Sequence, residues 1–329
     1  MDQKTHIRPA RHARHLRHEK YDQLIAYCAS LPDEPCAVVH PCDSASLTGA
    51  VRAAEVGLIR PILVGPRARI EAVARDAGLD ISRLELIDTP HSQASVEMGT
   101  KLAREGRVSM LMKGSVYTNE LLSEVVSREA GLRTDRRISH CFVMDVPLLD
   151  RPLIITDGGV NIFPTLAEKV DIVQNAIFLA HALGNPQPKV AILSATESVN
   201  PKIQSTLDAA ALCKMADRGQ ITGALLDGPL ALDNAVNLAA AQIKQIKSRV
   251  AGWADILVAP HLDAANMLAK SLTFLADAEA AGIVLGARVP IILTSRADSL
   301  ETRLGSAAIA VLLANHQARR AQRKGVRAV

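Results

Sequence analysis

The sequence predicts an α/β protein with mostly parallel sheets flanked by helices, divided into two domains with an active-site cleft between them. From residue 36 onward, short apolar runs alternate with amphipathic stretches, as in strand-helix-strand units. Apolar residues make up 48% of the chain and aromatic residues only 2%, which favours helices and parallel strands over a β-sandwich. At 329 residues the chain exceeds the size at which one core keeps growing, so two domains are expected.

The first series of apolar runs predicts five strands with four helices between them. The strands cover residues 36–40, 61–65, 84–87, 109–112 and 139–144. The helices begin near Ser46, Arg67, Ser92 and Thr118. Because each strand is followed by a helical stretch of crossover length, the connections are those of a parallel sheet.

The second series predicts six more strands, again alternating with helices. The strands cover residues 153–156, 190–194, 223–226, 256–258, 283–285 and 289–293. The helices begin near Thr165, Pro201, Asp233 and Leu262, with a last helix after Ser299.

The domains are expected to be discontinuous in sequence. Residues 145–152 contain two prolines and are the best candidate for the first crossing, and the chain returns near Gly286. This division gives a basic lead-in of residues 1–20, a first domain of residues 21–147 plus 287–329, and a second domain of residues 148–286.

Charge is unevenly distributed along the chain. The first 20 residues carry six Lys or Arg against two acidic residues, and residues 316–329 carry five against none. The ends therefore hold +9 while the formal net charge is +4, which leaves about −5 on the body between them. With its basic residues confined to the ends and few aromatic residues for base stacking, the chain is expected to have no nucleic-acid partner.

Cysteine usage and hydropathy indicate the compartment. The five cysteines are an odd number and form no Cys-x-x-Cys pair, which is typical of a reducing environment. No apolar run approaches the ~18 residues of a membrane span, and no hydrophobic signal core stands at the N-terminus. We therefore expect a cytoplasmic protein with no membrane partner.

Residues 290–298, Pro-Ile-Ile-Leu-Thr-Ser-Arg-Ala-Asp, form the most informative segment for function. An apolar run long enough for one buried strand ends at Ser295 and Arg296, and Ser299 then begins a helix. Ligands of open α/β sheets bind beyond the carboxyl ends of strands, and a helix N-terminus adds N–H donors for an anion. The segment therefore predicts a receptor for phosphate or another oxyanion; a strand end capped by polar residues is the alternative.

Two further strand ends carry polar residues. Lys113 follows an apolar strand beside Gly114, where an ammonium and a close backbone approach suit a phosphate or carboxylate; a solvated surface lysine is the alternative. Asp157 and Asn161 flank a glycine pair after another strand, and they either order that loop or touch a ligand.

Signals for a metal site are weak. Asp227 and Asp233 place two carboxylates on a predicted strand-to-helix turn, but these residues are also an ordinary turn residue and helix cap. His140 is isolated beside an apolar run and is expected to be a satisfied core or loop residue. We expect no bound metal.

Taken in order along the chain, these motifs resemble the phosphate acetyl/butyryl transferase family. The resemblance covers about residues 36–315. Its segments are residues 112–114, 156–161, 191–194, 214–220, 227–229 and 294–299. It implies a two-domain fold like that of isocitrate and isopropylmalate dehydrogenases, a homodimer, and acyl exchange between coenzyme A and orthophosphate, with coenzyme A as a substrate and no bound cofactor.

The resemblance also implies catalytic roles. The serine and arginine matching Ser295 and Arg296 hold the phosphate and the oxyanion of the reaction. The aspartate expected as the base, seven residues after the serine, is replaced here by Thr302. Asp298 is our hypothesis for the replacement base if the helix begins a turn early, with Glu301 behind it; Asp298 as a helix cap is the alternative.

Other members of the site follow from the same resemblance. Thr294, Lys113, Asp157 and Asn161 are expected to line the cleft. Arg133 lies in about the region of the arginines that bind phosphate and coenzyme A in the acetyltransferases.

We therefore predict an acyltransferase that exchanges an acetyl or short-chain acyl group, such as butyryl, between coenzyme A and orthophosphate, giving acyl phosphate. Residues 295–299 are more similar to the butyryl branch of the family. Two alternatives remain open. One is a metal-dependent decarboxylating dehydrogenase on the related fold, using Asp227 and Asp233, and the other is a non-catalytic paralogue that binds coenzyme A or acyl phosphate.

Overall fold

A single eleven-stranded sheet flanked by helices organises the described part of the chain. The computed structural model describes residues 18–129, 131–295 and 298–323. The strands are β1 (Glu34–Val39), β2 (Ile59–Gly65), β3 (Glu85–Asp88), β4 (Met110–Lys113), β5 (Ser139–Asp145), β6 (Leu153–Thr156), β7 (Lys189–Leu193), β8 (Leu225–Leu230), β9 (Ile256–Val258), β10 (Glu279–Leu285) and β11 (Ile291–Ile292).

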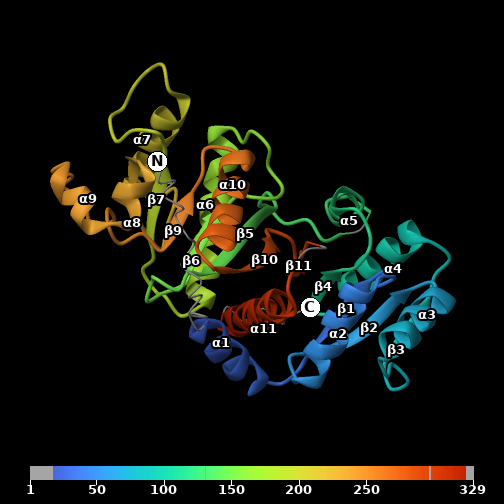
Figure 1. The fold of residues 1–329 in the computed structure, drawn as a ribbon. Coiled ribbons are helices and arrows are strands. Elements are labelled where there is room, and N and C mark those ends of the chain that lie inside the picture. Colours follow the sequence, from blue (N-terminus) through green and yellow to red (C-terminus); the bar gives the residue numbers. More distant parts are fainter. Residues whose placement is uncertain (1–17, 130, 296–297, 324–329) are drawn as a thin grey trace, which may run out of the picture.

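Helices cover the sheet and connect its strands (Figure 1). They are α1 (Glu19–Ala29), α2 (Ser44–Glu55), α3 (Arg67–Ala77), α4 (Ser92–Arg104), α5 (Thr118–Val125), α6 (Leu166–Ala182), α7 (Gln204–Asp217), α8 (Leu232–Val236), α9 (Leu238–Ile243), α10 (Leu262–Leu275) and α11 (Leu300–Arg323). None of the helices in these described ranges is long and apolar enough to cross a membrane.

The strand order is β3-β2-β1-β4-β11-β10-β5-β6-β9-β7-β8. Most neighbours are parallel, but β10 runs antiparallel to both β5 and β11, and β5 runs antiparallel to β6. The strands of residues 34–113 therefore form one side of the sheet and β6 to β9 the other, with β11, β10 and β5 between them (Figure 1). The prediction of a mixed α/β protein with mostly parallel strands is confirmed.

The predicted elements differ from the observed ones in a few places. Every predicted strand overlaps an observed strand, but β10 begins four residues earlier than predicted and β11 shrinks to two residues. Helix α1 was not predicted. The helix expected near Asp233 is split into α8 and α9, because Asn237 leaves the helical conformation and its side chain caps α9. Strands β5 and β10, which the predicted boundaries assign to different domains, pair with each other, and the division into domains stays a prediction.

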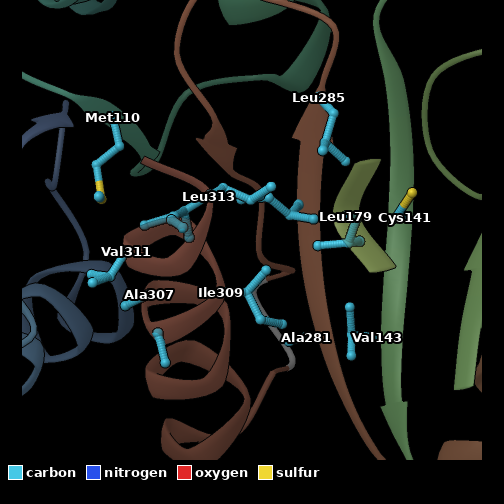
Figure 2. Close-up of a cluster of buried hydrophobic side chains, with 14 of the residues drawn as sticks. Met110, Cys141, Val143, Leu179, Ala281, Leu285, Ala307, Ile309, Val311 and Leu313 are labelled. Atoms are coloured by element: carbon cyan, nitrogen blue, oxygen red, sulfur yellow. The ribbon is translucent and has the colours of Figure 1, made fainter. Parts of the chain in front are cut away.

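The central strands are packed against the long helix α11. Helix α11 lies beside α1 and against β10 in the middle of the molecule (Figure 1). Figure 2 shows small and branched side chains of α11 meeting the buried faces of β5, β10 and α6. The labelled members are Met110, Cys141, Val143, Leu179, Ala281, Leu285, Ala307, Ile309, Val311 and Leu313. Because α11 is fixed in this way, its first turn has a defined place beside the ends of β10 and β11.

A buried ion pair joins helices α6 and α7. Lys169 Nζ lies 2.6 Å from Asp208 Oδ2, and the two side chains are only 6% and 8% exposed. Gln204 donates a second hydrogen bond to the other carboxylate oxygen of Asp208 at 2.8 Å. The carboxylate is therefore satisfied on both oxygens although water hardly reaches it.

Candidate active site

A cavity of about 590 Å³ lies at the carboxyl ends of β4, β6 and β11. One wall comes from the turn after β4 and the start of α5, and another comes from α10. The rest comes from β5, the first half of β10, and the segment that joins β11 to α11. Ligands of open α/β sheets bind at this edge, where strands end and helices begin. Its polar lining residues are Lys113, Tyr117, Thr118, His140, Asn266, Lys270, Thr273, Glu279, Thr294, Ser295, Asp298, Ser299 and Thr302.

The segment after β11 brings Thr294 and Ser295 to the cavity. Arg303, one turn into α11, donates from Nη1 to Thr294 Oγ1 at 3.0 Å and from Nη2 to the carbonyl oxygen of Ser295 at 2.7 Å. Thr294 is buried, whereas Ser295 is exposed. The fork of Arg303 thus fixes the backbone that carries the Ser295 hydroxyl.

Asp298 closes the turn that follows Ser295. Its Oδ2 accepts the backbone N–H of Ser295 at 2.6 Å, and its own N–H donates to the carbonyl oxygen of Ser295 at 3.3 Å. Burial raises the pKa of Asp298, while the Ser295 hydrogen bond and the charges of Arg303 and Lys270 oppose the rise. The predicted Arg296 lies outside the described residues.

Helix α11 begins at Leu300, as the sequence suggested, and not a turn earlier. Ser299 precedes it, and the Ser299 hydroxyl accepts the backbone N–H of Thr302 at 3.0 Å. The hypothesis that the helix begins a turn earlier, which would place Asp298 and Thr302 on one helix face, is therefore wrong. Asp298 lines the cavity from the loop before the helix. Glu301 is exposed in the first turn of α11.

Lys113 lies in the cavity where the sequence placed it, at the end of β4. Its ammonium donates to the carbonyl oxygen of Gly114 at 3.2 Å. A Cβ at Gly114 would overlap the carbonyl oxygens of Val39 and His40, so only glycine lets this turn pack against the end of β1. The close approach positions Lys113 on the cavity wall.

Asp157 and Asn161 order the loop after β6. The buried Asp157 carboxylate accepts the backbone N–H groups of Gly159, Val160 and Asn161 at 2.9, 3.0 and 3.2 Å, and also the Asn161 amide at 2.6 Å. Of the two readings left open by the sequence, loop ordering is the one that this geometry supports. Gly158 and Gly159 of the same loop line the cavity.

Arg133 and Asn161 line a second cavity of about 470 Å³ on the other side of that loop. Arg136 and Arg137 also line it, and Arg137 donates from Nε to Asn161 Oδ1. The structure therefore does not bring Arg133 into the cavity of Ser295. The loop of Asp157 separates the two spaces and contributes to both.

Four residues of the site were not predicted from the sequence to belong to it. Lys270 enters from α10, Arg303 from α11, Glu279 from the first position of β10, and His140 from β5. Thr302, which stands where the resemblance expects an aspartate, donates its hydroxyl to Glu279 Oε2 at 2.7 Å. A carboxylate thus lies against residue 302 although residue 302 itself has none.

His140 is buried as expected but is not satisfied. It is 1% exposed, and its Nδ1 forms no hydrogen bond within the described part of the chain. Burial lowers the pKa of His140 from 6.5 to about 4, with the charge of Asp157 opposing the shift. The imidazole on the cavity wall is therefore neutral at neutral pH.

This burial predicts a pH dependence of stability. Between pH 4 and 6.5 the unfolded chain binds the His140 proton and the folded chain does not, so the free energy of unfolding falls as pH is lowered through this window. The contribution is about 1.4 kcal/mol per pH unit and roughly 3 kcal/mol over the window. Urea unfolding of His140→Gln should show a slope against pH that is smaller by this amount. Equal slopes in the two proteins would contradict the assignment.

The two carboxylates considered for metal binding are engaged elsewhere. Asp227 lies inside β8 rather than in a turn, because the strand continues to Leu230, and its Oδ1 accepts the N–H of Gly228 at 2.8 Å. Asp233, in α8, lies 3.4 Å from Lys244 Nζ. The described ranges hold no group of three or more His, Cys, Asp or Glu arranged to bind a metal ion.

Known proteins resemble the chain over most of its length. The family model for Phosphate acetyl/butaryl transferase matches residues 91–311. A phosphate acetyltransferase from Rhizobium meliloti is 60% identical over 295 residues, covering 90% of this chain and 93% of that protein. A phosphate butyryltransferase from Clostridium beijerinckii is 41% identical over 296 residues, covering 90% of this chain and 98% of that protein.

Solved structures agree with these sequence matches. A branched-chain phosphotransacylase from Enterococcus faecalis V583 superposes with a TM-score of 0.76 at 29% identity, covering 86% of this chain and 99% of that one. A 4-hydroxythreonine-4-phosphate dehydrogenase from Klebsiella pneumoniae shares the fold at a TM-score of 0.51 and 14% identity, covering 87% of this chain and 99% of that one. The predicted likeness to a dehydrogenase-type fold is thereby confirmed. The chain belongs to the phosphate acetyl/butyryl transferase family.

Proposed function

We propose that the protein exchanges an acetyl or short-chain acyl group between coenzyme A and orthophosphate, giving acyl phosphate and coenzyme A. The observation that carries this proposal is the arrangement of the cavity. An exposed serine hydroxyl lies at a strand end beside two ammonium groups, Lys113 and Lys270, and two carboxylates, Asp298 and Glu279. An acyl transfer to or from phosphate needs these three kinds of group at one point.

Each kind of group answers a requirement of the reaction. A thiol is only a few per cent ionised near neutral pH, so its attack on an acyl phosphate needs a carboxylate to take the proton. Cationic and hydroxyl groups hold the phosphate and stabilise the oxyanion that develops on the carbonyl carbon. Apolar lining residues such as Val116, Phe142 and Leu293 provide a surface against which a short acyl chain can pack.

Position assigns the described residues their roles: Ser295 stabilises the developing charge, and Lys113 and Thr294 hold the phosphate end of the substrate. Arg296, outside the described residues, shares the role of Ser295 by the sequence resemblance alone. Asp298 remains the sequence-based candidate for the base. The arginines of the second cavity, Arg133 among them, are suited to the anionic part of coenzyme A, which acts as substrate; the reaction requires no bound cofactor.

Asp157 and Asn161 act on this site indirectly. Their hydrogen bonds shape the loop between the two cavities, and that loop presents Gly158 and Gly159 to the substrate. Since a Cβ on Gly158 would overlap the Phe142 ring, bulk is excluded from this wall.

The test is phosphate-dependent release of free thiol from acyl-CoA. Acetyl-CoA and butyryl-CoA, each with and without orthophosphate, should release coenzyme A only when phosphate is present, and an acyl phosphate should form in equal amount. Absence of release with every acyl chain tried would refute the proposal. Binding of coenzyme A in a calorimeter without turnover would instead favour the non-catalytic alternative.

We also propose a cytoplasmic homodimer. Helix α10 and the loop between β6 and α6, which contacts its first residue, expose apolar side chains: Ile162, Phe163, Met267, Phe274 and Leu275 are each more than half exposed. A patch of this kind is suited to an interface with a second copy of the chain. Light scattering of the purified protein should give the mass of two chains, and a mass of one chain would contradict it.

A further inference from the structure

The cavity contains two carboxylates, and their surroundings differ. Among the described lining residues these are Asp298, on the loop after Ser295, and Glu279, at the start of β10. A general base must reach the reacting proton with an oxygen that is not already committed to holding the protein together. Each carboxylate keeps one oxygen that no hydrogen bond among the described residues reaches, Oδ1 of Asp298 and Oε1 of Glu279, so the two differ in what their other oxygen holds.

Asp298 is committed to the backbone. Its Oδ2 accepts the Ser295 N–H at 2.6 Å, which closes the turn that presents the Ser295 hydroxyl. Removing the Asp298 side chain would therefore loosen Ser295 as well. This arrangement is typical of a side chain that shapes a loop.

Two hydroxyl groups hold Glu279 through its Oε2 atom. The Thr302 hydroxyl donates to Oε2 at 2.7 Å, and the Ser299 hydroxyl donates to the same oxygen at 3.2 Å. Within the described residues Oε1 receives no hydrogen bond. Two donors, one just before α11 and one in its first turn, thus orient the carboxylate, while its second oxygen stays available on the cavity wall.

Charged and titratable groups surround Glu279 on several elements. Asp145 of β5 is its partner in the strand register and is itself paired with Lys20 at 2.6 Å. Among the described residues, Tyr21 of α1 and Asp298 of the loop also lie within electrostatic reach of Glu279, while Lys270 of α10 and Arg303 of α11 act on Asp298. Cations on α10 and α11 therefore lie near one of the two carboxylates of the cavity, Asp298.

We infer that Glu279 is the general base of the acyl exchange, oriented by Thr302 and Ser299. The inference rests on the proposed function. Glu279 takes the proton of the coenzyme A thiol as the sulfur attacks the carbonyl carbon of the acyl phosphate. The carbon–sulfur bond forms, the bond from carbon to the phosphate oxygen breaks, and phosphate leaves with the electron pair. In the opposite direction phosphate attacks the thioester, and protonated Glu279 returns the proton to the departing thiolate.

The direct test is Glu279→Gln, which keeps an acceptor oxygen for the two hydroxyls but cannot take a proton from the thiol. We expect kcat to fall ~10²- to 10⁴-fold with much smaller changes in KM, because the base acts in the transition state. The acidic limb of the pH profile of kcat should also disappear. Wild-type turnover with an unchanged acidic limb would overturn the inference.

Asp298→Asn is the matched comparison, since it removes the other carboxylate of the cavity. The asparagine oxygen still accepts the Ser295 N–H, so a smaller loss of kcat and a retained acidic limb are expected. Loss of the limb in Asp298→Asn together with its retention in Glu279→Gln would assign the base to Asp298 and refute Glu279. Glu71→Gln, on the exposed surface of α3, should leave both quantities unchanged.

One further variant keeps the inference testable if Glu279→Gln fails to unfold cooperatively, and a double variant tests it where Glu279→Gln folds. Thr302→Val removes a donor that stabilises the ionised carboxylate, so the acidic limb should move to higher pH; a limb at the wild-type position would contradict the inference. In the Glu279→Gln background, Thr302→Asp returns a carboxylate to the site from residue 302, whose hydroxyl lies 2.7 Å from Glu279 Oε2 in the unsubstituted protein. The Thr302→Asp double variant should recover part of kcat and the acidic limb of its pH profile. The Thr302→Asn double variant should recover neither. Equal kcat values for the two double variants would contradict a general base at the position of Glu279.

The outcomes separate this inference from the proposed function. A wild-type protein that releases no thiol from any acyl-CoA refutes the proposed function. An active wild-type protein whose Glu279→Gln variant is equally active refutes only the role of Glu279.

Discussion

Replacement of Ser295 by alanine is expected to lower kcat by ~10²- to 10³-fold while the protein stays folded. The hydroxyl is one preorganised donor at the point where negative charge develops, and removal of one such donor costs a reaction about this much. The backbone around it is held by Arg303 and Asp298 through main-chain atoms of Ser295, so the substitution leaves those hydrogen bonds in place. Initial rates of thiol release at saturating substrate measure the effect.

The Ser295→Ala result is informative only beside two controls. Ser82→Ala changes an exposed serine in the turn before β3 and should leave kcat unchanged. The melting temperature of Ser295→Ala should match that of the wild type. A Ser295→Ala variant with the kcat of the wild type would show that the hydroxyl does not meet the transition state, and the cavity would then lose its assigned oxyanion donor.

Replacement of Lys169 by alanine is expected to destabilise the protein by about 3–5 kcal/mol. The pair with Asp208 lies between α6 and α7, and both side chains are less than a tenth exposed. Loss of the ammonium leaves a carboxylate that water cannot solvate, with one remaining hydrogen bond from Gln204. Equilibrium unfolding in urea measures the change.

Two comparisons show whether burial causes the effect. Lys214 and Asp217 form an ion pair at nearly the same distance, 2.7 Å, but both side chains are about two thirds exposed, so Lys214→Ala should change stability little. The double substitution Lys169→Met with Asp208→Leu removes both charges and should recover most of the loss. Equal effects of Lys169→Ala and Lys214→Ala would contradict the account of the buried pair.

The strands were predictable because each is an apolar run between polar stretches, and this pattern is local in sequence. The boundaries that failed depend on contacts with distant segments. Strand β8 continues through Asp227 to Leu230 because it pairs with β7, and β10 starts at Glu279 because it pairs with β5. Apart from Leu230, the added residues are Asp227, Gly228 and Pro229 in β8, and Glu279, two alanines and Gly282 in β10. These residue types are depleted in strands, so neither extension is visible in the residues alone.

The cavity residues that follow strands could be predicted for the same reason. Lys113, Thr294 and Ser295 follow apolar strands directly, and strand ends mark the ligand edge of an open sheet. Lys270, Glu279 and Arg303 lie on elements that meet the cavity only after the chain has folded, and no short motif precedes them. Asp157 and Asn161 were recognised by their glycines, but the sequence left open whether they touch a ligand or hold the loop.

Thr302 illustrates the limit of residue-by-residue comparison. In the sequence it is a missing carboxylate, which led to Asp298 as the substitute. In the structure the Thr302 hydroxyl donates to Glu279, which lies 23 positions earlier in the chain and on another element. A functional group can therefore be supplied to one point in space from a different position in the sequence, and only the tertiary contact reveals it.

A crystal structure of the complex with coenzyme A and orthophosphate tests the central claim most directly. The account predicts the thiol sulfur in the cavity of Ser295, within about 3.5 Å of Glu279 Oε1, with the phosphate beside Lys113 and the Ser295 hydroxyl. The anionic part of coenzyme A should extend toward the cavity of Arg133. A sulfur atom bound away from Glu279, or a phosphate that does not contact Ser295, would contradict it.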